Sequence, residues 1–246
     1  MDGSVKMSLD AGILILSISN PATANSLTPL VLEEIDSGLR RAQTSEVRVV
    51  VVTGEGDNFC SGGDMHYLGL DDEDAGISYI SRVTQLLATL RMFPKPVIAA
   101  VHGHAVGGGA EIACEADLLL LSPAASLRLS DVTIGSSPAT VFRLVRLVGL
   151  GVANRMTLLG AELKADEALM LGLALDVVDR DELLGRAIDV ARRLAAFSPL
   201  ALRSAKQALR LAQSADPFTD LAVNLEAEAN CYRSPEMKEA VRRFLT

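Results

Sequence analysis

One short segment constrains the fold of this chain more than any other: an apolar run typical of a strand ends in three glycines, and a helical pattern follows directly. The segment covers residues 95–113, and the glycines are Gly107, Gly108 and Gly109. Because glycine has no Cβ, the backbone at these positions can approach a ligand closely. The helix that follows directs its unpaired N–H groups and positive dipole end toward the same space. We therefore expect a strand–loop–helix unit that holds an anion, or a carbonyl oxygen that becomes one.

Glu111 lies in the first turn of this predicted helix, where its carboxylate can transfer a proton. The alternative is a tight turn in which Glu111 only interacts favourably with the helix dipole. A dinucleotide site is not expected, because the glycines lack the G-x-G-x-x-G spacing of that motif.

A second glycine-rich loop follows a buried, β-branched run at residues 49–52, which is typical of a strand. The loop, residues 59–64, reads Phe-Cys-Ser-Gly-Gly-Asp, and Asp64 is placed to cap a following helix. Two such loops can each offer one backbone N–H to the same oxygen.

The first part of the chain alternates predicted strands and helices, which indicates an α/β core with helices packed on sheets. Strands are predicted at residues 12–18, 47–53, 97–101, 118–121 and 127–129, and helices at residues 29–41, 77–91 and 109–116. From residue 181 only helices are predicted, at residues 183–196, 199–212, 217–229 and 235–245. The acidic run at residues 71–74 is predicted to be a solvated loop.

Composition and charge argue against several classes of protein. The 246 residues carry a formal net charge of −8, which disfavours nucleic acid and anionic membranes as partners. No apolar run approaches the ~20 residues needed to span a bilayer, and we expect a cytoplasmic protein without a secretory signal. The cysteines, Cys60, Cys114 and Cys231, have no metal-ligand spacing, so we expect ordinary reduced thiols and no metal site.

Several segments, in their order along the chain, resemble the crotonase superfamily, which is the enoyl-CoA hydratase/isomerase family. They are residues 20–27, 59–64, 95–113, 130–135, 144–149 and 160–173. The resemblance implies an α/β fold built as a crotonase-like spiral of ββα units over residues 1–180, which contains the active site. It also implies a C-terminal helical oligomerisation region over residues 181–246, which assembles a homotrimer or a dimer of trimers.

The same resemblance implies the catalytic groups. It places an oxyanion hole at the N–H groups of Gly63 and Gly108, which would stabilise a thioester carbonyl as it becomes an enolate. Glu111 corresponds to the first of two carboxylates that act in family hydratases, and Asp131 stands in place of the second, which is a glutamate. Aspartate reaches roughly 1.5 Å less far than glutamate. Judged alone, Asp131 also fits a helix N-cap or a turn residue.

Further residues are expected to contact the substrate, and coenzyme A is expected as part of that substrate, with no separate cofactor. They are Ser61, Asp64, His66, Gly107 and Pro138. The expected reaction is hydration, or a double-bond shift, of a 2-enoyl-CoA by a lyase of this family.

Departures from the family pattern leave other substrates and functions open. The loop after Gly135 lacks a glycine pair that family hydratases carry, and Ala24 and His66 stand where Lys or Arg is common. Together with the negative net charge, these residues weaken the expected attraction for a free CoA nucleotide. The alternatives are a carrier-protein-bound or non-CoA substrate, with decarboxylation or carbon–carbon cleavage as the reaction, and a catalytically silent scaffold.

Overall fold

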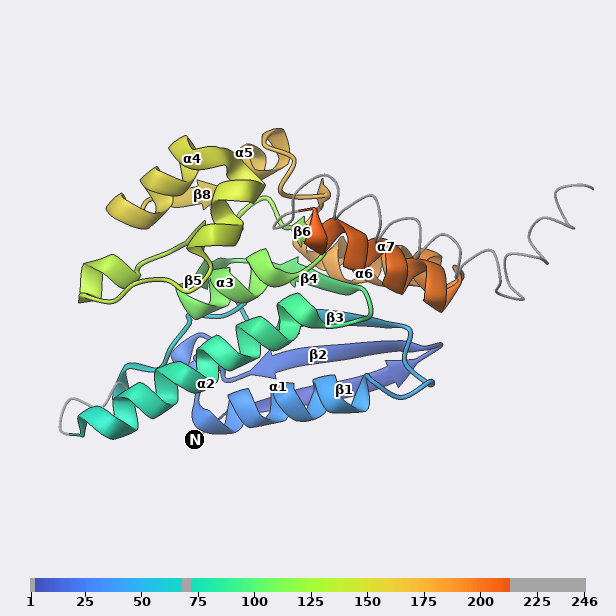
Figure 1. Ribbon diagram of the computed structural model, residues 1–246, viewed down its shortest axis with the longest axis horizontal. Coiled ribbons are helices and arrows are strands. Elements are labelled where there is room, and N and C mark those ends of the chain that lie inside the picture. The colour runs from blue at the N-terminus through green and yellow to red at the C-terminus, as the bar shows by residue number, and fades with distance from the viewer. Residues whose placement is uncertain (1–2, 68–71, 213–246) are drawn as a thin grey trace, which may run out of the picture.

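The computed structural model describes residues 3–67 and 72–212, and a six-stranded sheet forms its centre (Figure 1). The strand order is β1-β2-β3-β4-β6-β9, in which β1 and β2 are antiparallel and all other neighbours are parallel. These strands are β1 Ser4–Asp10, β2 Ile13–Ser19, β3 Val49–Gly54, β4 Val97–Val101, β6 Leu118–Leu121 and β9 Asp176–Val177. A smaller sheet has the order β5-β7-β8, formed by His104–Val106, Ser126–Arg128 and Glu162–Lys164.

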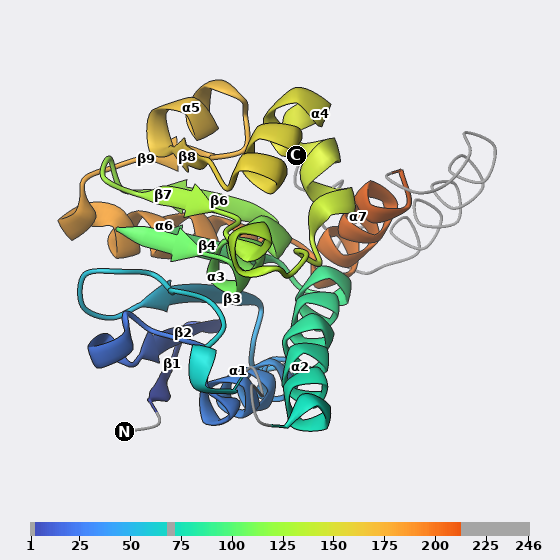
Figure 2. The same ribbon diagram turned by 90° about the vertical axis from the view of Figure 1, so that its left-hand side faces the viewer.

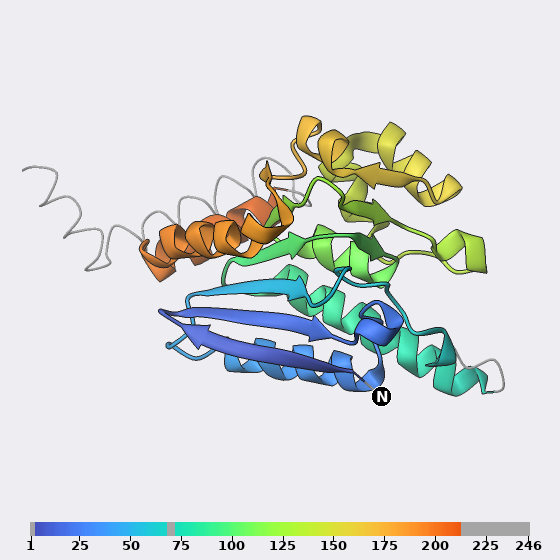
Figure 3. The ribbon, with the colours of Figure 1, turned by 180° about the vertical axis from the view of Figure 1, so that it is seen from behind.

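Helices cover both faces of the large sheet, as Figures 2 and 3 show. The α-helices of the described residues are α1 Pro29–Arg41, α2 Glu73–Met92, α3 Gly108–Glu115, α4 Val141–Leu159, α5 Ala165–Met170, α6 Arg180–Ala195 and α7 Pro199–Leu211. Of these, α1, α2 and α3 pack on one face of the large sheet and α6 packs on the other. Side chains alternate across a strand, so Val50 and Val52 join the core under α1, α2 and α3, whereas Val49 and Val51 join the core under α6. All six residues of β3 are buried, as expected for a parallel strand covered on both sides.

The predicted α/β organisation is confirmed, and the predicted strands lie within two residues of their observed ends. One local prediction was wrong: the acidic run is not all loop, because α2 begins at Glu73. Asp72 precedes this helix, and its Oδ1 accepts a hydrogen bond from the N–H of Ala75 at 3.0 Å. Acidic side chains at a helix N-terminus interact favourably with its dipole, which explains why the helix starts within the run.

Other predictions about the fold remain open. The helices predicted at residues 217–229 and 235–245 lie outside the described residues. The division at residue 180 and the assembly of the C-terminal region stay predictions. Within residues 3–67 and 72–212, no helix combines the length and the apolar character that crossing a bilayer requires.

Candidate active site

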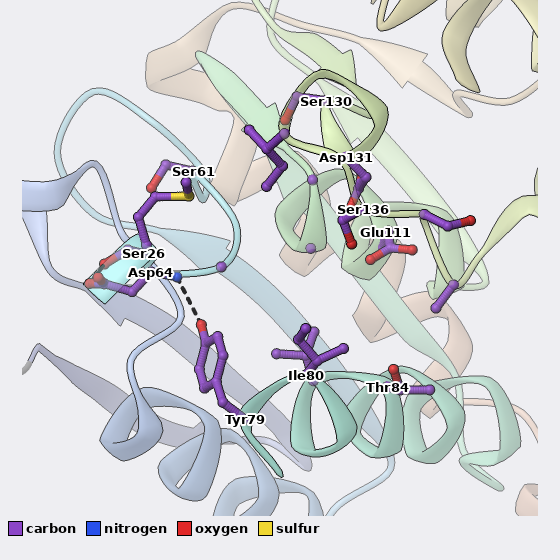
Figure 4. Close-up of a pocket in the computed structure, with 18 of the residues that line it drawn as sticks. Ser26, Ser61, Asp64, Tyr79, Ile80, Thr84, Glu111, Ser130, Asp131 and Ser136 are labelled. Atoms are coloured by element: carbon purple, nitrogen blue, oxygen red, sulfur yellow. Dashed lines mark hydrogen bonds between the residues drawn. The ribbon is translucent and has the colours of Figure 1, made fainter. Parts of the chain in front are cut away.

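A cavity of about 400 Å³ opens where the loop after β3, helix α2, the start of α3 and the turn around η3 (Asp131–Ile134) meet (Figure 4). All predicted site residues except one line it: Ser61, Gly63, Asp64, His66, Gly107, Gly108, Glu111 and Asp131. Pro138 is the exception, because it is buried while its neighbours Ser137 and Ala139 line the cavity. The geometry therefore does not support the substrate contact predicted for Pro138.

The buried side chain of Asn25 fixes the first of the two glycine loops. Its Nδ2 donates to the carbonyl oxygens of Glu55 and Asn58 at 2.8 and 2.7 Å, and its Oδ1 accepts from the N–H of Asn20 at 2.7 Å. Asn25 adopts a φ of 64°, a left-handed conformation that asparagine tolerates better than most residues. The loop after β3 is thereby held on one path toward the cavity.

Glycines are required where the two loops touch each other. A Cβ on Gly62, whose φ is +87°, would lie 2.4 Å from the carbonyl oxygen of Val106. A Cβ on Gly109 would lie 2.2 Å from the carbonyl oxygen of Cys60. Cβ atoms in folded proteins essentially never come within 3.0 Å of another non-bonded heavy atom. We expected glycine to permit close approach to a ligand, and at these two positions it permits close approach between the loops.

Gly63 and Gly108 both line the cavity, and in the part of the chain that the structure describes neither N–H group has a hydrogen-bond acceptor. Gly108 is the first residue of α3, so its N–H belongs to the unpaired set at a helix N-terminus. Unpaired N–H groups in a cavity wall are the donors that a developing oxyanion needs.

Three neighbours hold Asp64 at the mouth of the first loop. Its N–H donates to the Tyr79 hydroxyl at 2.8 Å (dashed in Figure 4), its Oδ2 accepts from the Ser26 hydroxyl at 2.8 Å, and its Oδ1 accepts from the His66 N–H at 3.0 Å. The last bond caps the short turn η2 (Met65–Tyr67), as predicted for Asp64. Burial alone would raise the pKa of Asp64, but the hydrogen bonds from His66 and Ser26 outweigh burial and lower it.

Glu111 is buried against the turn that leads into α4. Its Oε1 accepts a hydrogen bond from the backbone N–H of Thr140 at 2.9 Å. Burial raises the pKa of Glu111 to about 7; the negative charge of Asp131 adds to the rise, and the N–H groups of Thr140 and Ala139 oppose it. A carboxyl group with a pKa near neutral pH can both accept and donate a proton.

Asp131 begins η3 and shares the cavity with Glu111. Burial raises the pKa of Asp131. Its Oδ2 is buried and has no hydrogen-bond partner among the described residues, which favours the protonated carboxyl group. The alternative of a helix N-cap is wrong, because Ser130 occupies that position and no side chain caps the turn.

Several lining residues were not predicted from the sequence. The α2 contribution consists of Tyr79, Ile80, Val83 and Thr84, and polar residues from other elements include Ser26, Ser130, Ser136 and Ser137. The apolar periodicity of α2 was visible in the sequence, but it does not reveal which helical turn faces a cavity. The serines carried no signal beyond their proximity to predicted residues.

Thiol chemistry and metal binding are two further kinds of chemistry that the described residues can be tested for. Burial raises the pKa of Cys60 and of Cys114 to about 12, so neither thiol ionises near neutral pH. Across residues 3–67 and 72–212, no three His, Cys, Asp or Glu side chains are grouped so that they could hold a metal ion. Among the carboxyl groups that line the cavity, Glu111 and Asp131 have a raised pKa, whereas the pKa of Asp64 is lowered.

The α/β fold and the cavity, in which unpaired N–H groups accompany carboxyl groups with raised pKa values, are typical of an enzyme that uses acid–base catalysis. The model of the enoyl-CoA hydratase/isomerase family matches residues 8–246. A short-chain-enoyl-CoA hydratase from Clostridium acetobutylicum is 32% identical over 98% of this chain and 94% of that protein. A 2,3-dehydroadipyl-CoA hydratase from Escherichia coli is 33% identical over 95% of this chain and 92% of that protein. The crystal structure of an enoyl-CoA hydratase from Polaromonas sp. JS666 matches with a TM-score of 0.94 at 30% identity, covering 99% of this chain and 97% of that one.

The chain belongs to the enoyl-CoA hydratase/isomerase family. The predicted crotonase-like fold and the prediction of an enzyme of this family are thereby confirmed. The individual roles assigned to Gly63, Gly108, Glu111 and Asp131 stay predictions, which the geometry now makes specific.

Proposed function

We propose that this enzyme hydrates a 2-enoyl-CoA whose acyl thioester binds in the cavity. One observation carries the proposal: two unpaired backbone N–H groups, on Gly63 and Gly108, line the same cavity as two carboxyl groups with raised pKa values, Glu111 and Asp131. The relatives from Clostridium acetobutylicum and Escherichia coli, both named as hydratases of CoA thioesters, support the same reaction.

The two N–H groups act on the thioester carbonyl oxygen. As the oxygen of water bonds to C3 of the enoyl group, electrons move through the conjugated system onto the carbonyl oxygen and form an enolate. Gly63 and Gly108 donate hydrogen bonds to that oxygen as its negative charge grows. Loss of one such donor raises the barrier by about 3–4 kcal/mol.

Glu111 and Asp131 divide the two proton transfers. The N–H of Thr140 supports the ionised form of Glu111, so Glu111 accepts the proton that water loses as its oxygen bonds to C3. In the reacting state the two carboxyl groups hold one proton between them, with Glu111 ionised and the proton on Asp131, whose Oδ2 receives no hydrogen bond among the described residues. Asp131 gives this proton to C2 as the enolate collapses. The product is a 3-hydroxyacyl thioester, and exchange with solvent restores both carboxyl groups.

A thioester on the pantetheine arm of a carrier protein is the second candidate substrate. The described lining of the cavity contains neither Lys nor Arg, and His66, which stands where the family often has lysine, has a side chain 90% exposed and paired with Asp64. A pantetheine arm needs no cation for a nucleotide phosphate. This candidate keeps the same catalytic groups and differs in the carrier.

The proposal also includes assembly into a homotrimer or a dimer of trimers in the cytoplasm. Large apolar side chains on α4 and α5 are exposed, with Phe142 at 80%, Leu159 at 75% and Met170 at 78%, and such exposure marks a protein contact surface. The free thiols of Cys60 and Cys114 suit a reducing compartment. Light scattering of the purified protein tests the trimer, and a monomer in solution would contradict it.

The test of the proposed reaction is incubation of the enzyme with crotonyl-CoA and identification of the product. We expect loss of the absorbance of the conjugated thioester and a product heavier by one water. A product of unchanged mass with a shifted double bond would contradict hydration and show that the reaction is an isomerisation. Turnover of crotonyl-pantetheine at a higher kcat/KM than crotonyl-CoA would favour the carrier-protein substrate.

A further inference from the structure

An ion pair between the half-buried Arg91 and the fully buried carboxylate of Glu115 lies behind Glu111, outside the lining of the cavity. Glu115 stands one helical turn after Glu111 on α3, and its side chain is 0% exposed. Arg91, in the last turn of α2, donates from Nε to Oε2 of Glu115 at 2.9 Å and from Nη2 to Oε1. Arg143 on α4 adds a second cation, with its Nε 3.5 Å from the same Oε2.

Thr140 connects this ion pair to Glu111. Its hydroxyl donates to Oε1 of Glu115 at 2.7 Å, and its backbone N–H donates to Oε1 of Glu111 at 2.9 Å. Thr140 is fully buried at the N-cap position of α4, yet its side chain does not cap that helix. A threonine at an N-cap normally accepts a hydrogen bond from the first helical turn, whereas here the hydroxyl is committed to Glu115.

The cluster joins three helices at the point where Glu111 is held. Arg143 also donates to the carbonyl oxygens of Cys114 and Ala116 at 2.6 and 3.1 Å, so α4 is tied to the end of α3 as well as to Glu115. Buried ion pairs contribute little net stability, because desolvation offsets their attraction, but removing one partner leaves an uncompensated charge. A cluster of this kind therefore defines geometry more than it adds stability.

We propose that Glu115 is a positioning residue for the reaction: paired with Arg91, it orients Thr140, and through the Thr140 N–H it fixes the carboxylate of Glu111 in the cavity. This inference rests on the proposed function, because it assigns Glu111 the proton transfer. Displacing a reacting group by about 1 Å can lower a rate about 100-fold. The charged groups that face Glu111 are Asp131 from η3, Glu115 from its own helix and Arg91 from α2.

Glu115→Gln tests the charge of the positioning residue. We expect kcat for crotonyl-CoA hydration to fall about tenfold while KM changes less than about twofold, since Glu115 does not touch the substrate. The acid limb, which is the rise of kcat/KM with pH on the acidic side of its profile, should move to lower pH. The negative charge of Glu115 raises the pKa of Glu111, and the substitution removes this charge. A residue that only stabilises the fold would lower the amount of folded enzyme and leave kcat per folded enzyme unchanged.

Thr140 variants test the link between Glu115 and Glu111, and they keep the inference testable if Glu115→Gln does not fold. Thr140→Val keeps the backbone N–H and the side-chain shape but removes the hydroxyl that Glu115 orients. We expect kcat to fall about tenfold and the acid limb to move to higher pH, opposite to Glu115→Gln, because the N–H donor to Glu111 loosens. Thr140→Ser restores the hydroxyl, and we expect it to restore most of the rate.

Glu167→Gln is the matched control, since Glu167 pairs with Arg155 outside the cavity lining. It should leave kcat and the pH profile unchanged.

The inference would be overturned if folded Glu115→Gln and folded Thr140→Val both had the wild-type kcat and an acid limb at the wild-type pH. If the wild type does not hydrate crotonyl-CoA, the proposed function fails. A ¹³C-carboxyl titration of Glu111, assigned with Glu111→Gln, then still decides whether the two variants move its pKa in opposite directions.

Discussion

The hydroxyl of Tyr79 links Asp64, the last residue of the first glycine loop, to Leu27. It accepts a hydrogen bond from the backbone N–H of Asp64 at 2.8 Å and donates one to the carbonyl oxygen of Leu27 at 2.6 Å. Asp64 directly follows Gly63, whose N–H is proposed to bind the thioester oxygen. Burial raises the pKa of Tyr79 to about 12, so the hydroxyl stays protonated and can make both bonds. A residue of α2 thereby sets the path of the loop that carries one oxyanion donor.

Tyr79→Phe should therefore weaken both the fold and the reaction. It leaves a buried N–H and a buried carbonyl without their partner, which costs about 1–3 kcal/mol of unfolding free energy. We expect kcat to fall about tenfold, because the peptide that contains the Gly63 donor is less well held. Urea denaturation and steady-state kinetics measure the two effects. Tyr67→Phe is the control, because the Tyr67 ring lies beside that of Tyr79, with centroids 5.8 Å apart, and should change neither quantity.

Glu111→Gln should stabilise the protein at alkaline pH and not at acidic pH. The native pKa of about 7 lies above the ordinary value of 4.5, so the favourable contribution of the protonated group is complete below about pH 4.5 and is lost as the pH rises through 7. Above that pH an ionised Glu111 costs the folded state up to about 3 kcal/mol, which an uncharged glutamine avoids. Chemical denaturation at about pH 5 and about pH 8 measures the difference. An equal effect at both pH values would contradict the buried titration of Glu111.

Asp131→Asn should lower both the rate and the pKa of Glu111. The substitution removes the proposed proton donor to C2, so we expect kcat to fall by about 100-fold or more. When Asp131 is ionised its charge raises the pKa of Glu111; asparagine carries no charge, so the acid limb of the residual kcat/KM should move to lower pH. The pH profile of the variant against wild type provides the measurement. An acid limb that stays in place would show that the two carboxyl groups do not interact.

Three glycines should respond differently to alanine. In Gly109→Ala the new Cβ would lie 2.2 Å from a backbone oxygen, and we expect a loss of about 3 kcal/mol of stability. In Gly63→Ala the nearest atom, the Tyr79 hydroxyl oxygen, would lie 3.5 Å away, so the protein should fold, while the methyl group beside the proposed donor lowers kcat about tenfold. Gly151→Ala in α4 meets nothing within 4 Å, so this control should leave kcat unchanged and gain up to about 1 kcal/mol of stability from helix propensity. Thermal unfolding and kinetics of the three variants distinguish the cases.

Local patterns predicted the elements that carry the site, because a β-branched run or a glycine-to-helix transition can be recognised over a few residues. The strand β1 was missed although Val5, Met7 and Leu9 alternate with more polar residues, which is the signal of a half-buried strand. Pro138 was assigned to the substrate because it lies in the right loop, and proximity in sequence does not say which side chains of a turn face inward.

Long-range partnerships lie beyond such patterns. Tyr79 reaches Leu27 across 52 positions, and Glu115 reaches Arg91 and Thr140 across 24 and 25 positions. No periodicity relates residues at these separations, because the packing of α2, α3 and α4 brings them together. The resemblance to a family supplied the proposed catalytic pair, Glu111 and Asp131, whereas the residues that contact Glu111 became visible with the three-dimensional structure.

The most direct test of the proposed role of Glu111 compares the crotonyl-CoA hydration rate of the wild type with that of Glu111→Gln at saturating substrate. Glutamine keeps the shape and the acceptor for the Thr140 N–H but cannot accept a proton from water. We predict measurable hydration by the wild type and a fall in kcat of about 100-fold or more in the variant, with KM little changed. Hydration at an unchanged rate in a folded variant would contradict the role of Glu111 and place the chemistry elsewhere.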